Sequence, residues 1–202
     1  MAKTVLVVDD IAFKPYACGT MTQPFIDCAI KLAESGAKAD DVSKILCRVG
    51  EGTVHRLWAP LEVKHNPVTP YHAKFSTPFC MAIGFLDAKA GLAQFSQARI
   101  EDAQARAFAA KISYEINPDD PYPRQFIGHL RATLKNGEVR EIHQPFMRGG
   151  AQAPMSTGEV ETKCVDNCLH GGWSRDRAEK LRALSGGIFT SRELGAMAEF
   201  RS

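Results

Sequence analysis

A lysine stands beside a proline in the segment FKPYAC (residues 13–18), just before a stretch with helical periodicity. That stretch opens at Gln23-Pro24, where apolar positions begin to recur at helical spacing. A cationic side chain in a loop before a helix N-terminus is well placed to meet an anionic substrate. The simpler alternative is a solvated lysine, the commoner state of this residue type. Lys14 is therefore the first candidate for contact with an anion.

Two later segments carry further candidates. TPYHAKFSTPF (69–79) places Lys74 and Ser76 before an apolar run, and RGGAQAPMS (148–156) places Arg148 beside Gly149. An arginine with adjoining glycines can offer a planar guanidinium and exposed backbone amides to a carboxylate. The plainer alternatives are a Ser76 that only caps its helix, a solvated Lys74 and a flexible connection at Arg148.

In this order and spacing, the three segments resemble the C-terminal part of the MmgE/PrpD family, from about Val5 to Lys163. Members include 2-methylcitrate dehydratase, cis-aconitate decarboxylase and an iminodisuccinate epimerase, which act next to carboxylates on small polycarboxylic acids. The resemblance implies a smaller, lid-like domain that faces a larger all-helical domain across a cleft. It also implies that Lys14 pairs with a substrate carboxylate or an enolate-like charge, and that Lys74, Ser76, Arg148 and Gly149 belong to the substrate site.

Two positions depart from the family pattern. Five residues after the lysine, the dehydratase and decarboxylase branches typically carry a histidine suited to proton transfer, and this chain has Gly19. An aromatic position that is often tyrosine in the family is Phe79, which has no hydroxyl. These departures count against dehydratase or decarboxylase chemistry as such. They leave room for an epimerase-like member, another substrate or a catalytically weakened copy.

Composition excludes several other classes of protein. Lysine plus arginine number 25 against 23 aspartate plus glutamate, without a basic block, so we expect no nucleic-acid partner. Cys164, Cys168 and His170 form a metal-like group, but a structural zinc site needs four ligands and a second cysteine pair is missing. Phosphate-binding glycine loops, nucleophile elbows and zinc-protease motifs are also missing, so we expect no cofactor and no metal.

The N-terminal residues and the absence of long apolar runs favour a cytoplasmic location. Apolar residues never run uninterrupted for the roughly 18 positions of a membrane span. The start at Met1 shows no apolar signal region, so we expect a natural start and a cytoplasmic protein with reduced cysteines.

The periodicity predicts an α+β fold: an antiparallel sheet packed with helices, followed by a helical tail. We expect helices from Thr22 to Ala33, after Ser76, from Ile100 to Ala110, and at several points after Pro154, the last from Ser191 to Phe200. Extended segments are expected at 4–8, 53–58, 112–116, 126–134 and 138–142, and 42–49 should turn helically before becoming a strand. Asn136-Gly137 predicts a hairpin, and 59–70 should be a loop.

We divide the chain into an α+β lid-like domain (1–150) and a C-terminal helical segment (151–202). The resemblance begins close to where the family's all-helical domain ends, and a cleft needs groups from both walls. We therefore expect one subunit of a split enzyme, completed by a separately encoded all-helical subunit. The alternative is a non-catalytic binding or interaction protein derived from this domain, associating with itself or with a partner.

Overall fold

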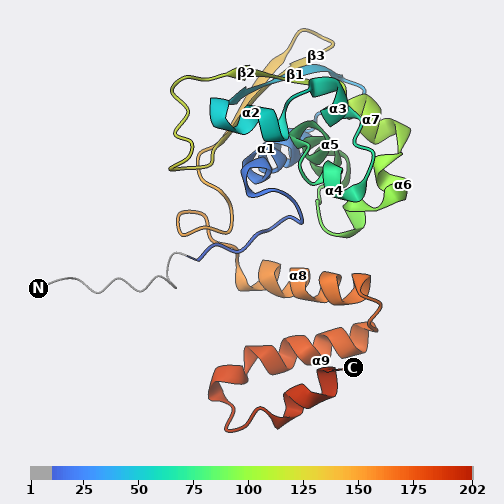
Figure 1. Ribbon diagram of the computed structural model, residues 1–202, viewed down its shortest axis with the longest axis vertical. Helices are drawn as coiled ribbons and strands as arrows, with labels where there is room; N and C mark the ends of the chain where they lie inside the picture. Colours follow the sequence, from blue (N-terminus) through green and yellow to red (C-terminus); the bar gives the residue numbers. More distant parts are fainter. Residues whose placement is uncertain (1–10, 202) are drawn as a thin grey trace, which may run out of the picture. The chain divides into compact units, whose positions relative to one another are not determined.

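The computed structural model describes residues 11–201, which divide into a unit that ends at Pro154 and a second unit that begins at Met155. The strand expected at 4–8 lies outside the described residues. Within the first unit, the described helices are α1 (Gln23–Glu34), α2 (Glu51–Leu57), α3 (Leu61–His65), α4 (Pro70–Ala73), α5 (Thr77–Asp87), α6 (Gln97–Ile100) and α7 (Ala103–Ala109) (Figure 1).

The sheet of this unit has four strands among the described residues: β1 (Val42–Val49), β2 (Ile112–Ile116), β3 (Gly128–Leu134) and β4 (Val139–Gln144). Their order is β2-β1-β3-β4. The β3–β4 hairpin turns at Gly137, whose φ is +88°, as the Asn-Gly pair predicts. β1 and β2 run parallel, and the segment from α2 to α7 forms the long crossover connection that a parallel pair requires. The sheet is therefore mixed. The α+β class expected from the sequence is confirmed.

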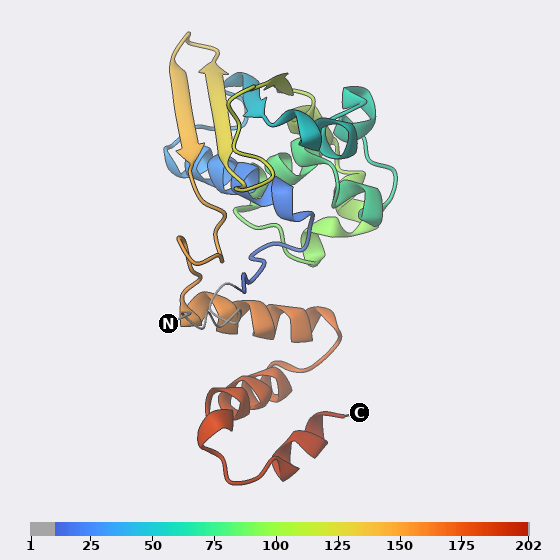
Figure 2. The same cartoon turned by 60° about the vertical axis from the view of Figure 1, so that its left-hand side comes forward.

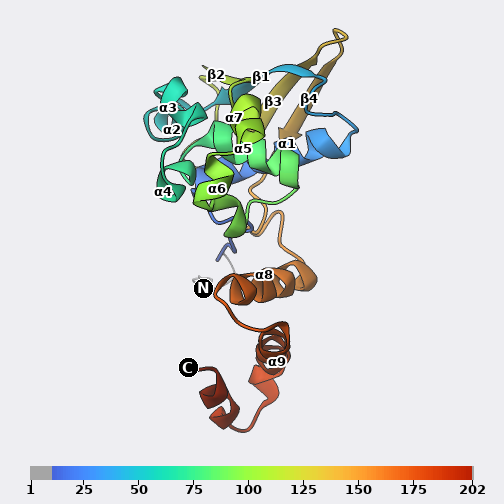
Figure 3. The ribbon, with the colours of Figure 1, turned by 90° about the vertical axis from the view of Figure 1, so that its right-hand side faces the viewer.

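Helices cover one face of the sheet (Figure 3). α1 packs against β3, β4 and α5, and Figure 2 shows it beside the β3–β4 hairpin. Two glycines let α1 pack closely against α5 and β3. A Cβ at Gly84 of α5 would lie 2.8 Å from the Ile26 side chain, and one at Gly128 of β3 would lie 2.4 Å from the Pro24 carbonyl oxygen. The apolar side of α1 and the inward residues of β1 thereby form one core.

Local signals explain most of these elements. Ser76 caps α5 by accepting a hydrogen bond from the Phe79 amide, as expected. The prediction of an extended 53–58 is wrong, because Thr53 and Leu57 are buried four residues apart, as on a helix face. The predicted loop at 59–70 contains the short helix α3, and the predicted helix at 100–110 divides into α6 and α7.

The second unit consists of α8 (Thr157–His170), α9 (Arg175–Gly186) and two short 3-10 turns, the later one at Gly195–Phe200 where a helix is expected. α8 begins with a capping box between Ser156 and Glu159. Arg182 bridges the two helices through Glu161 at 3.2 Å. Only Val165 and Ala178 are buried among the described residues of this unit, so its core is small.

Candidate functional site

The loop that carries Lys14 is tied to three other segments of the first unit. Each tie is a backbone hydrogen bond of 2.9 Å: Phe13 N–H to Gly149 O, Ala17 N–H to Ala90 O, and Gly19 N–H to Lys74 O. The structure therefore brings together the three segments that the sequence singled out. Residues 13–19 form the common element to which the other two attach.

Lys14 lies at the exposed surface of this loop. Its Nζ is 3.4 Å from the carbonyl oxygen of Cys18, which closes the loop on itself. This bond leaves the ammonium group near the surface, where an anion can approach it. Charge on an exposed lysine is also screened, so Lys14 needs a second group to hold a ligand firmly.

Arg148 is anchored by two buried residues. Its Nη2 donates to the Tyr16 hydroxyl at 3.0 Å, its Nε donates to Asp27 Oδ1 at 3.1 Å, and Tyr16 donates to the same Oδ1 at 2.6 Å. The guanidinium also lies over the Tyr16 ring, 5.2 Å from its centroid. Tyr16 is 5% and Asp27 6% exposed, so this closed triangle is largely removed from water. We call these three residues the Tyr16–Asp27–Arg148 clasp.

Burial governs the ionisation of the clasp. It raises the pKa of Asp27 above its ordinary value, although the Tyr16 hydroxyl and the Arg148 charge oppose this shift. Burial and the neighbouring Asp27 raise the pKa of Tyr16 as well. The phenol therefore stays protonated at neutral pH and acts as a hydrogen-bond donor to the carboxylate.

Gly149 allows the 148–150 turn to touch the Lys14 loop. Its φ is +90°, a conformation that favours glycine. A Cβ at this position would lie 1.8 Å from the Phe13 carbonyl oxygen. The turn closes with a 2.7 Å bond from the Gly149 amide to Ala153 O. No residue with a side chain can replace Gly149 without moving one of the two segments.

Lys74 and Ser76 take different positions. Lys74 is half-buried, with its Nζ 5.9 Å from the centroid of the Phe95 ring, and its carbonyl oxygen receives the Gly19 amide. Ser76 is fully buried, and besides capping α5 its hydroxyl donates to the Lys64 carbonyl oxygen. Lys74 therefore adjoins the Lys14 loop, whereas the contacts of Ser76 are structural.

Replacement of Ser76 by alanine should lower the free energy of unfolding by about 2 kcal/mol, because it removes a helix cap and a buried hydrogen-bond donor. Ser156→Ala is the matched control: it removes an exposed cap from α8 and should cost about 1 kcal/mol. Urea denaturation measures both. Equal losses would show that the bond from Ser76 to Lys64 contributes nothing.

The family comparison agrees with this geometry. The family model described as MmgE/PrpD C-terminal domain matches residues 16–186. The chain belongs to the MmgE/PrpD family. No match is found among the curated proteins.

The two departures from the MmgE/PrpD pattern now have positions. Gly19 is buried, and a Cβ there would lie 3.4 Å from the Phe75 ring, so a side chain at this position would start in contact with that ring. Phe79 lies in the first turn of α5 and is completely buried in the core. In this MmgE/PrpD chain, Phe79 therefore packs the core.

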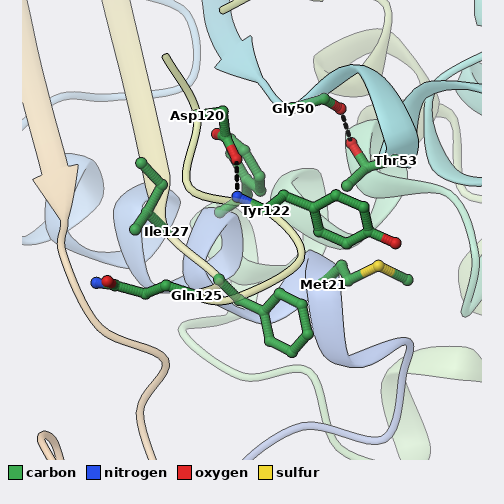
Figure 4. A pocket seen from close by; sticks show the side chains of 9 residues that line it. Met21, Gly50, Thr53, Asp120, Tyr122, Gln125 and Ile127 are labelled. Atoms are coloured by element: carbon green, nitrogen blue, oxygen red, sulfur yellow. Dashed lines mark hydrogen bonds between the residues drawn. The ribbon is translucent and has the colours of Figure 1, made fainter. Parts of the chain in front are cut away.

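A shallow hollow lies where the loop before β3 meets α2 (Figure 4). Its lining includes Met21, Tyr122 and Gln125, and none of the five candidate residues borders it. Asp120 accepts the Tyr122 amide at 2.9 Å, which fixes its rim. Its cavity volume is about 10 Å³, far below the roughly 300–1,000 Å³ typical of ligand pockets, so we assign it no function.

The sequence analysis proposed neither Asp27 nor Tyr16 as a site residue. Tyr16 is buried, but its hydroxyl also holds the carboxylate and the arginine. A signal was present: Asp27 lies on α1 between the apolar residues Ile26 and Cys28, both of which are completely buried. A carboxylate in such surroundings is normally paired.

Two further observations concern other classes of site. Among residues 11–201, no cluster of three histidine, cysteine or acidic side chains is arranged to hold a metal ion. No helix in that range is long and apolar enough to cross a membrane.

Proposed function

We propose that this chain is the lid-type wall of an MmgE/PrpD enzyme that abstracts a proton next to a carboxylate of a small polycarboxylic acid. The reaction ends in elimination or reprotonation, as in a lyase or an epimerase. The lid comprises 1–150, with 151–202 as a helical extension. We place the enzyme in the cytoplasm, where all six cysteines, which are free, stay reduced.

One observation carries the proposal: the Lys14 loop joins the Lys74 and Arg148-Gly149 segments through backbone hydrogen bonds. This arrangement brings together three segments that each carry a cationic residue: Lys14, Lys74 and Arg148. Lys14 meets a substrate carboxylate or the negative charge that develops when the proton leaves, and Lys74 adds to the field. Arg148 adds its positive charge nearby, although its Nε and Nη2 are engaged by Asp27 and Tyr16.

The base for proton abstraction comes from a partner domain or subunit. Asp27, the carboxylate of the clasp, is buried and bonded to two neighbours, so it is poorly placed to receive a proton from substrate. Gly19 offers no proton-transferring side chain. A separately encoded all-helical subunit of the family would provide the missing groups, and the chain alone would be inactive.

Hydrogen exchange in deuterium oxide tests this function. The chain and its helical partner are incubated together with citrate-like and amino-dicarboxylic acids, and NMR follows the proton next to the carboxylate. We expect loss of that signal, or elimination, with the pair and neither with the chain alone. Exchange catalysed by the chain alone would contradict the proposal.

The second candidate is a non-catalytic binding protein, favoured by Gly19 and by the burial of Phe79. Such a protein would bind a small polycarboxylate or associate with itself through the surface around Lys14. It differs from the first candidate in one result of the same experiment: the acid would bind, yet its proton would not exchange with solvent in the presence of the helical partner.

A further inference from the structure

The clasp joins three segments that are distant in the sequence. Tyr16 belongs to the Lys14 loop, Asp27 to α1, and Arg148 to the turn after β4. Asp27 Oδ1 accepts from both other members, so the carboxylate is the shared centre of the contact. Its only other oxygen, Oδ2, is buried without a hydrogen-bond partner among the described residues.

The clasp and the glycine turn hold the same pair of segments from two sides. On one side, side chains join Tyr16 to Arg148; on the other, the Phe13 amide donates to Gly149 O. Lys14 lies between Phe13 and Tyr16 in the sequence, so both of its flanks are fixed to the 148–149 turn. The position of the Lys14 backbone therefore depends on this double attachment.

We infer that Tyr16 and Asp27 are positioning residues, which fix the Lys14 loop against the Arg148 turn and so set where the two cationic side chains stand. Neither contacts substrate, because both are buried. The inference rests on the proposed function in one respect: the proposed function makes the Lys14 loop the surface that faces substrate. The attachment itself is a property of the isolated chain.

The positive charge of Arg148 explains why a carboxylate is needed at the centre of the clasp. Arg148 brings a permanent positive charge into a site where its side chain is only 28% exposed. Asp27 offsets that charge, and the Tyr16 hydroxyl occupies the same acceptor oxygen. An asparagine at position 27 keeps the shape of the side chain but leaves the guanidinium without its counter-charge. We therefore expect Asp27→Asn to loosen the turn while leaving the core packing in place.

Amide hydrogen exchange of the full chain, measured residue by residue by NMR, tests the inference. The reporters are the amides of Phe13 and Gly149, which donate to Gly149 O and Ala153 O. We expect exchange at both amides to accelerate at least tenfold in Asp27→Asn, and to a smaller extent in Tyr16→Phe, which removes the hydroxyl without leaving a charge unpaired. Amides in β1 should change only as much as global stability changes.

Asp87→Asn is the matched control, because it breaks a comparable pair in which Arg99 Nη2 lies 2.6 Å from Asp87 Oδ1. This variant should leave the two reporters unchanged after correction for global stability. The inference would be overturned if Asp87→Asn accelerated exchange at the Phe13 and Gly149 amides as much as Asp27→Asn does. It would also be overturned if neither clasp variant accelerated exchange there.

Activity separates the inference from the proposed function. In the assembled enzyme, we expect Tyr16→Phe to raise KM for the acid more than it lowers kcat, because the loop samples wrong positions before substrate binds. Faster amide exchange with unchanged kinetics would keep the attachment but remove the proposed function of the Lys14 loop. Unchanged amide exchange would overturn the inference whatever the kinetics.

Discussion

Gly149→Ala is expected to destabilise the first unit by about 3 kcal/mol or more, because the substitution combines backbone strain with a collision that only separation of two segments can relieve. The φ of +90° disfavours any residue with a side chain. The new Cβ would also lie 1.8 Å from the Phe13 carbonyl oxygen, far inside contact distance. Thermal or urea denaturation of the chain measures the loss.

Two other glycines separate strain from collision. Gly36 and Gly137 have φ of +87° and +88°, and a Cβ at either would meet nothing within 4 Å. Alanine at these positions should cost only about 1–2 kcal/mol, the strain of the left-handed conformation. A loss at Gly149 no larger than at Gly36 and Gly137 would show that the Lys14 loop is not held against the turn.

Lys14→Ala should lower kcat/KM of the assembled enzyme by about 100-fold to 1,000-fold, the range seen when one group that stabilises developing negative charge is removed. The side chain is exposed and its bond to Cys18 O is long, so the stability of the chain should barely change. Steady-state kinetics and denaturation of the same preparation measure both effects.

Lys44→Ala is the control for this substitution, since Lys44 is an exposed lysine on β1 outside the candidate segments. It should change neither activity nor stability appreciably. An assembled enzyme in which Lys14→Ala is as active as Lys44→Ala would remove Lys14 from the site.

Local signals in the sequence predicted much of the fold. Apolar periodicity and proline placed α1, Ser76 placed the start of α5, and Asn136-Gly137 placed the β3–β4 hairpin. These signals depend on neighbouring residues, which is why the sequence carries them. The parallel pairing of β1 with β2 depends on a crossover of several helices, and no residue of either strand indicates this pairing.

Of the candidate site, too, one part could be predicted from the sequence and another could not. The residue types at Lys14, Lys74 and Arg148-Gly149 singled out three segments, and the backbone hydrogen bonds show that these segments meet. The clasp could not be predicted, because Tyr16, Asp27 and Arg148 are far apart in the sequence and the partner of a buried carboxylate is set by tertiary packing. α2 was mistaken for a strand because its short apolar pattern fits both periods.

We propose that this chain is one wall of an enzyme whose other wall is an all-helical MmgE/PrpD partner. The most direct test is affinity purification of the chain from its native host, with mass spectrometry of the eluted proteins and the native mass of the complex. We predict recovery of an all-helical protein of that family at equal stoichiometry, in a complex that exchanges the proton next to a carboxylate. Recovery of the chain alone, as a stable homo-oligomer, would contradict the claim and favour the binding protein.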